Sequence, residues 1–249
     1  MLTSASRLSR SAAHQAAISL IARSAISKNV SSARTLTASA RTCSSGRRMV
    51  SFGHSRHYAT STTPTSSSLD PADEESQRFL EEGTTHLEAG DLARAKESYQ
   101  RSLSIKRNSS ALFNLGVCLY HDRDLAAAIE AWNESLELAP ESADAHTNLA
   151  SAYVLSKPSR PDLAVSHLKT AASITPEDPE IQYNLAAVLE ACEQLEEALT
   201  AYKRALEGGI QRAEQNIRNC SAKLLSAKFA VQQQQEEQQK QQEASKNVE

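Results

Sequence analysis

The sequence predicts an all-α protein, a solenoid of stacked helical hairpins followed by one further helix. The main observation is a pattern of small and large side chains that recurs at intervals of 33, 34 and 36 positions. The chain has only 7 Gly in 249 residues, well below the usual share of about 7%, which disfavours a turn-rich β-sandwich or barrel. Pro140 and Pro176 stand at the same point of two successive units. A helix must stop there, because proline has no N–H to donate.

Four columns define the repeat. A small residue in the first helix of each unit is followed in the second helix by Ala, then by a large residue four positions on, then by a small residue after three more. Small side chains are expected where two helices meet, and the large one fills the space between units. The columns are Gly83, Gly116, Ala150 and Ala186; Ala95, Ala128, Ala164 and Ala198; Tyr99, Trp132, Leu168 and Tyr202; and Ser102, Ser135, Ala171 and Ala205.

This pattern resembles the tetratricopeptide repeat family, in which Trp, Leu-Gly, Tyr, Ala, Phe and Pro recur with a period of about 34 residues. The resemblance implies a right-handed α-solenoid of four hairpins over residues 75–212, with the repeats at about 76–108, 109–142, 143–178 and 179–212. The end units depart from the pattern, with Glu82 in place of Leu and Gly208-Gly209 in place of Pro. End repeats are commonly atypical, because one of their faces meets solvent.

Residues 210–231 continue with apolar side chains at alternating spacings of three and four, which predicts a helix. We expect it to cap the last repeat. Small Ala213, Cys220 and Ala227 alternate there with larger residues, which favours packing on a flat surface over the alternative, a coiled-coil dimer seam. The chain is therefore expected to be a monomer, with a dimer through residues 210–231 as the alternative. Residues 232–249 contain eight Gln and are either an extension of this helix or disordered.

Residues 1–69 contain nine Arg and Lys, 26 Ser and Thr, and no Asp or Glu. This composition is typical of an organellar transit peptide. Arg56-His57-Tyr58 resembles a matrix-processing motif, so residues 1–58 are predicted to be a mitochondrial transit peptide and the mature chain to begin at Ala59. Residues 59–74 then form a flexible Ser/Thr/Pro tether. The alternatives are a basic tail that binds an acidic partner and a plastid address. Arg density favours mitochondria, in the matrix or at the inner membrane.

Composition also excludes several functions. After residue 69 the chain has 18 Lys and Arg against 30 Asp and Glu, a formal charge of −12, which argues against binding nucleic acid. The four Cys have no metal-ligand spacing, and no common nucleophile, zinc or phosphate motif occurs. No apolar run reaches the roughly 18 residues of a membrane span. We therefore expect no catalytic site, no cofactor and no bound metal.

The resemblance implies that the first helices of the hairpins line a concave groove for a client protein or peptide. Apolar side chains gathered there would mark the binding surface. The residues that map to this groove are Leu80, Thr84, Leu87, Phe113, Asn114, Val117, Tyr120, Thr147, Asn148, Ser151, Val154, Tyr183, Asn184 and Ala187.

One column of the groove contains Asn114, Asn148 and Asn184, although Asn is a mediocre helix former. The amides either form a ladder that holds a peptide backbone or bond to neighbouring helices. The favoured function is a mitochondrial adaptor or assembly factor that binds a client in the groove. A permanent structural subunit of a larger complex is the alternative, and an enzyme with an unrecognised site is a weaker one.

Overall fold

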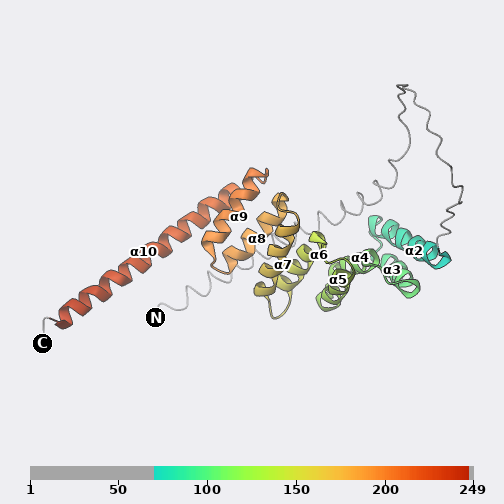
Figure 1. Cartoon of the computed structure of the whole chain (residues 1–249), viewed down its shortest axis with the longest axis horizontal. Coiled ribbons are helices and arrows are strands. Elements are labelled where there is room, and N and C mark those ends of the chain that lie inside the picture. Colours follow the sequence, from blue (N-terminus) through green and yellow to red (C-terminus); the bar gives the residue numbers. More distant parts are fainter. Residues whose placement is uncertain (1–69, 247–249) are drawn as a thin grey trace, which may run out of the picture.

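The computed structural model describes residues 70–246, which form a row of helical hairpins followed by a long helix (Figure 1). The predicted transit peptide at residues 1–58 and residues 59–69 of the predicted tether lie outside the described residues. The hairpins are α2 (Pro71–Glu88) with α3 (Leu92–Ile105), α4 (Ser109–His121) with α5 (Leu125–Leu138), α6 (Ala143–Leu155) with α7 (Pro161–Ile174), and α8 (Pro179–Ala191) with α9 (Leu195–Glu207); α10 (Ala213–Lys246) follows them.

The two helices of each hairpin pack against each other, and each hairpin packs against the next. α10 packs on α9 at the end of the row. All sixteen residues of the four repeated columns are buried. The predicted fold class, an all-helical stack of hairpins with a C-terminal helix, is therefore confirmed.

The column of small residues has a direct steric cause. A Cβ placed on Gly83 would lie 2.7 Å from the ring of Tyr99, and one on Gly116 would lie 2.5 Å from the indole of Trp132. The Trp132 indole N–H also donates to the carbonyl of Phe113, at 3.0 Å. The large residue of the second helix thus lies on the small residue of the first, which sets the distance between the two helices.

Side-chain caps determine where most helices begin. Asp91 and Asp124 cap α3 and α5 by accepting from the backbone N–H three residues ahead. Asp70 caps α2 in a similar way and Pro71 occupies its first turn, where a missing N–H is harmless. Residues 71–74, which composition assigned to the tether, are therefore the first turn of α2.

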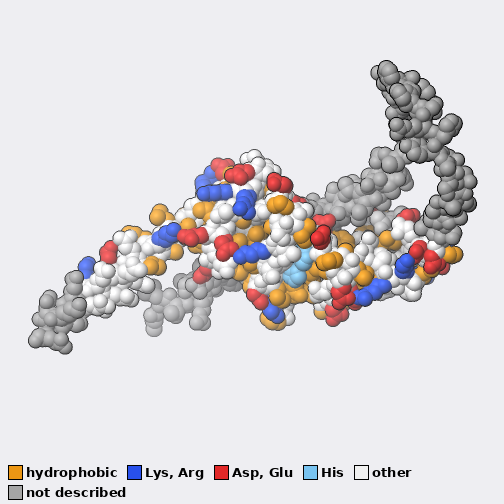
Figure 2. Space-filling model, viewed as in Figure 1, with side chains coloured by type: hydrophobic (Ala, Val, Ile, Leu, Met, Phe, Trp, Pro, Cys, Tyr) orange, Lys and Arg blue, Asp and Glu red, His pale blue; other side chains and the backbone are white. Residues whose placement is uncertain are grey.

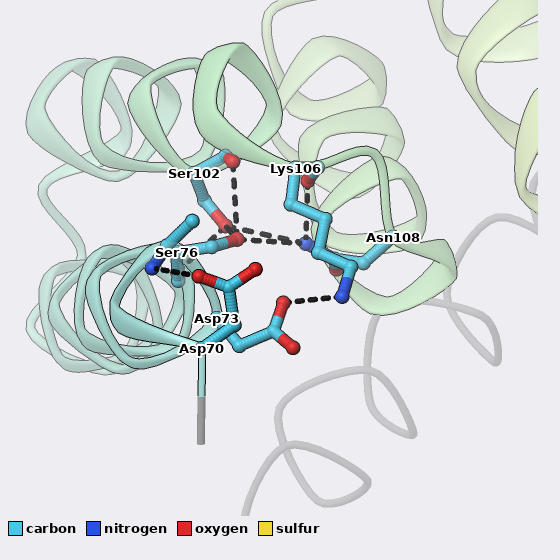
Figure 3. A network of polar contacts seen from close by, with 7 residues as sticks. Asp70, Asp73, Ser76, Ser102, Lys106 and Asn108 are labelled. Carbon is cyan, nitrogen blue, oxygen red and sulfur yellow. Dashed lines mark hydrogen bonds and ion pairs between the residues drawn. The ribbon is translucent and has the colours of Figure 1, made fainter. Parts of the chain in front are cut away.

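A polar network joins α2, α3 and the start of α4 (Figure 3). The buried Ser102 hydroxyl donates to the carbonyl of Ser76 at 2.8 Å, and the Asn108 amide donates to the Ser102 hydroxyl at 3.3 Å. Lys106 forms an ion pair with Asp73 at the rim of the network. Hydrogen bonds thus join the two helices of the first hairpin at Ser102. The fourth hairpin has the buried Ala205 at the same position of the repeat.

α10 begins as a packed helix and continues as an exposed one. Ala213 and Cys220 are fully buried, whereas residues 225–242 are all exposed. Lys223 and Lys228 reach back to Glu190 and Glu196 as ion pairs. Hydrophobic side chains remain on the surface of the projecting part (Figure 2).

The Gln-rich segment is helical as far as Lys246. Within residues 70–246, none of the helices combines the length and the apolar character that a membrane span needs.

Candidate peptide-binding groove

The predicted groove residues lie on the first helices of the hairpins, α2, α4, α6 and α8. α2 and α4 also contact each other directly. Leu80, Leu87 and Phe113 are half-buried, so part of each side chain is available to a partner. Thr84 is half-buried as well, and its hydroxyl donates to the carbonyl of Leu80 at 3.0 Å.

A hollow of about 210 Å³ opens where α4, α5 and α6 meet. Phe113 supplies an aromatic ring, Asn114 an amide and Asp144 a carboxylate. Such a mixture of one apolar surface and a few convergent polar groups is typical of a binding site. Its lining consists of Ser109, Ser110, Phe113, Asn114, Ser135, Ala139, Ser142 and Asp144.

Five of the predicted apolar groove residues are less accessible than expected. Val117 and Tyr120 are buried in a cluster with Trp132, and Tyr183 packs edge-on against Tyr202 at 5.6 Å. Val154 and Ala187 are 5% and 4% exposed. The expectation of exposed apolar groups was wrong for these five, because they belong to core clusters that two successive hairpins form together.

The Asn column contacts the large residue of the preceding hairpin. Asn114 hydrogen-bonds to the Tyr99 hydroxyl. Asn216 of α10 donates to the Tyr202 hydroxyl at 3.0 Å. It follows Asn184 at close to the repeat interval and is the fourth member of the column. α10 therefore continues the Asn column beyond the fourth hairpin, and the spacing to Asn216 is the signal that sequence analysis missed.

Asn184 lacks such a partner. The large residue of its preceding hairpin is Leu168, which has no polar atom. The Asn184 side chain is 1% exposed, and its Oδ1 accepts no hydrogen bond. A buried acceptor without a donor is destabilising by about 1–3 kcal/mol. The Tyr120 hydroxyl is likewise buried without a partner.

In α6 the three predicted polar groove residues are buried. Thr147 is 7% exposed, Asn148 3% and Ser151 1%. The Ser151 hydroxyl donates to the carbonyl of Thr147 at 3.1 Å. Ser151 is thereby satisfied within its own helix and has no need of a ligand.

Outside the groove, His146 and His167 face each other with their Nδ1 atoms 2.9 Å apart. His146 Nε2 lies 3.3 Å from the carbonyl oxygen of Pro140, which can only accept, so this nitrogen carries the proton. His167 Nδ1 therefore donates to His146 Nδ1. Burial lowers the pKa of both rings. Tyr153 stacks on His167 at 5.6 Å and covers it further.

The described residues contain no cluster of three or more His, Cys, Asp or Glu suited to a metal ion. Burial also raises the pKa of the Cys118 thiol to about 12. A thiol of that pKa is protonated at neutral pH and is a poor nucleophile.

The tetratricopeptide repeat family matches residues 80–143 and again residues 158–209. The chain is a tetratricopeptide repeat protein. Both matches are to repeats, and neither is to a catalytic domain. No curated protein matches the sequence of the chain.

Solved structures show the same fold. MamA from Desulfovibrio magneticus RS-1, residues 41 to the end, is 20% identical with a TM-score of 0.55, covering 64% of this chain and 90% of that one. Another MamA structure is 24% identical with a TM-score of 0.51, covering 57% and 84%. Cut9–Hcn1 of the APC/C is 21% identical with a TM-score of 0.52, covering 58% and 29%. At these identities the similarity shows the fold alone.

Proposed function

We propose that this tetratricopeptide repeat protein is a non-catalytic adaptor or assembly factor of mitochondria that holds a client peptide or subunit in its concave groove. Tetratricopeptide repeat domains are typical of protein–protein interaction, which supports the proposal. Phe113, Asn114 and Asp144 around one hollow offer a client both apolar contact and hydrogen bonds. The acid-free N-terminal segment supports the mitochondrial location.

The observation that carries the proposal is the hollow between α4, α5 and α6. The half-buried ring of Phe113 gives it an apolar surface, and Ser110 and Asn114 place polar side chains beside that ring. A site of this kind can hold an apolar side chain of a client while its polar groups bond to the client backbone.

The experiment uses a photo-reactive phenylalanine analogue in place of Phe113, with the same analogue at the exposed Ala126 of α5 as control. The full chain is expressed in its own cells, and mitochondria are illuminated. We expect one defined cross-linked client from position 113 and none from position 126. Equal cross-linking from both positions, or none from either, would contradict a client in the groove.

A second substitution tests an amide of the hollow. In the chain cross-linked through position 113, Asn114→Ala should lower the yield of the client at least fivefold, a loss of about 1 kcal/mol. Asn216→Ala is the matched control, because it removes the same amide from α10 and should leave the yield unchanged. N-terminal sequencing of the mitochondrial form should give Ala59; a retained Met1 or a cytosolic protein would contradict the location.

The alternative, a permanent structural subunit, is favoured by α10. Leu225, Phe229 and Val231 are 71%, 60% and 52% exposed, and such side chains suit a lasting interface. Two measurements separate the two functions. A purified chain that sediments as a monodisperse monomer favours the adaptor. Loss of the protein from cells that lack its complex favours the permanent subunit.

A further inference from the structure

The face of the first helices that borders the groove is acidic. We define the groove columns as the Asn column together with the positions four before, three after and seven after it, which share one helix face. In the four hairpins the charged members are Glu81, Glu88, Asp144 and Glu180, and the same columns continue through Asn216 on α10 to Arg212 and Lys223. Glu180 forms an ion pair with Arg212, and Lys223 pairs with Glu190, which stands outside the columns. The groove columns themselves therefore carry a negative formal charge.

The second helices lack this asymmetry. α2, α4, α6 and α8 together hold nine Asp and Glu against a single Arg, Arg78. α3, α5, α7 and α9 hold eight Asp and Glu against six Lys and Arg. The negative charge of the array is therefore concentrated on the helices that carry the groove. An occupant of complementary charge must be basic.

The chain itself contains a segment of that chemistry. All nine Lys and Arg that precede the array lie within residues 1–58, which have no Asp or Glu. We propose that in the precursor residues 1–58 occupy the acidic groove of the same chain and are displaced from it when they are cleaved off. This inference rests on the proposed function, because it assigns an occupant to the proposed client groove.

The connection is long enough for this contact. Residues 59–69 separate the basic segment from Asp70 at the start of α2, and eleven extended residues span about 36 Å. A helix is about 10 Å across, so the basic segment can pass over several first helices without strain in the tether.

The groove offers a basic segment more than charge. A guanidinium carries five N–H donors and no acceptor, and the exposed Asp144 lines the same hollow as the half-buried ring of Phe113. That ring offers a face on which a guanidinium can stack. The basic segment thus matches both the charge and the aromatic surface of the hollow.

The covalent connection explains how cleavage frees the groove. A tethered segment has an effective concentration near the millimolar range, so even weak binding fills the site. Once the chain is cut before Ala59, the segment is diluted and the groove becomes available to a client. The segment would thus keep the precursor from binding clients before it is processed.

The test is subtilisin digestion of the full chain at 50 mM salt, with loss of residues 1–58 followed by mass spectrometry. A synthetic peptide of residues 1–58 gives the unprotected rate. We expect at least tenfold slower loss in the full chain, and a rate near that of the free peptide at 500 mM salt, where charge interactions are screened. Glu81→Lys with Asp144→Lys should also abolish the protection.

The matched control is Glu130→Lys with Glu134→Lys on α5, which changes the net charge equally but leaves the groove intact. It should retain the protection. Arg7→Glu with Arg10→Glu provides a second test that cannot unfold the array, and it should weaken the protection. Melting curves show that the variants are folded.

Three results overturn the inference: loss as fast as from the free peptide, protection that the groove variants do not change, or protection that depends on protein concentration. None of these bears on the client proposal, because the cross-link from position 113 is read on the mature chain. A defined client with an unprotected leader would leave the proposed function in place and remove only this inference.

Discussion

The first and fourth hairpins follow the same repeat and are stabilised differently. In the fourth, nine consecutive residues of α8, residues 181–189, are buried, and α9 and α10 complete one large apolar cluster. In the first, the buried apolar cluster contains only Ala95, Tyr99 and Cys118, and the polar network of Ser76, Ser102 and Asn108 closes the rest.

The difference follows from the neighbours of each hairpin. The fourth hairpin lies between α7 and α10, so it can bury apolar side chains on two sides. Within the described residues the main neighbour of the first hairpin is α4. In a repeat array, stability is a sum of local terms and nearest-neighbour terms. Unfolding is therefore expected to begin at α2 and α3, and the fourth hairpin should be the last to open.

The largest effect should come from Tyr202→Ala. Tyr202 is 1% exposed, and its hydroxyl donates to Glu190 at 2.8 Å. Its loss should lower the free energy of unfolding by about 4 kcal/mol, measured by urea denaturation. The corresponding change in the first hairpin, Tyr99→Ala, should instead produce early local unfolding of α2 and α3 with a smaller shift of the main transition. Identical urea denaturation curves for the two variants would contradict the expected difference in stability between the first and fourth hairpins.

The next effect tests the role of α10 in the fourth hairpin. Ile217 packs against the large apolar cluster, and Leu224 is half-buried. Changing both to Lys should destabilise the monomer by about 3 kcal/mol, because two apolar contacts are lost and charges are placed against the cluster. Leu225→Lys, at an exposed position, is the control. Sedimentation would reveal the opposite case, in which the double variant only converts a dimer into a stable monomer.

A reciprocal exchange of one column compares the two hairpins directly. Ala205→Ser places a hydroxyl in the apolar cluster and should lower stability by about 2 kcal/mol. Ser102→Ala removes hydrogen bonds from Ser76 and Asn108 and should lower it by about 1 kcal/mol. If Ser102→Ala were stabilising, the network would be a remnant of poor packing rather than a source of stability. Thermal denaturation of both variants decides this.

The smallest effect is a pH dependence of stability that arises in the second and third hairpins. Burial lowers the pKa of His121, His146 and His167 in the second and third hairpins. The unfolded chain then binds protons first as the pH falls through the ordinary histidine pKa of about 6.5, so stability is lost below that pH. The melting temperature should be lower at pH 5 than at pH 7.5. His167→Gln should reduce this difference.

Most of the fold could be predicted from the sequence, because the repeat depends on side-chain size. The small Gly116 and the large Trp132 allow their two helices to pack closely in only a few orientations. The same pairing of a small residue with a large one recurs in all four repeats. The groove was harder to predict. Tyr183 and Val117 belong to columns that face the groove in the family, but in this chain both are packed in buried apolar clusters.

The polar features depended on partners that are distant in sequence. The bond between Asn216 and Tyr202 shows that α10 continues the Asn column, but residue 218 is Arg where the pattern has Gly or Ala, so the continuation is hard to see in the sequence. The His146–His167 contact joins two helices at positions that no column marks. Such contacts require the three-dimensional arrangement of the helices.

The length of α10 has a consequence for hydrogen exchange. A helix of 34 residues extends about 50 Å, and only its first turns pack on α9. Amides near Cys220 can exchange only when the fourth hairpin opens, whereas amides beyond Gln232 exchange whenever a single turn frays. The protection factors along this one helix should therefore fall steadily from Ala213 to Lys246, and a partner that binds its far end would be seen as protection appearing there.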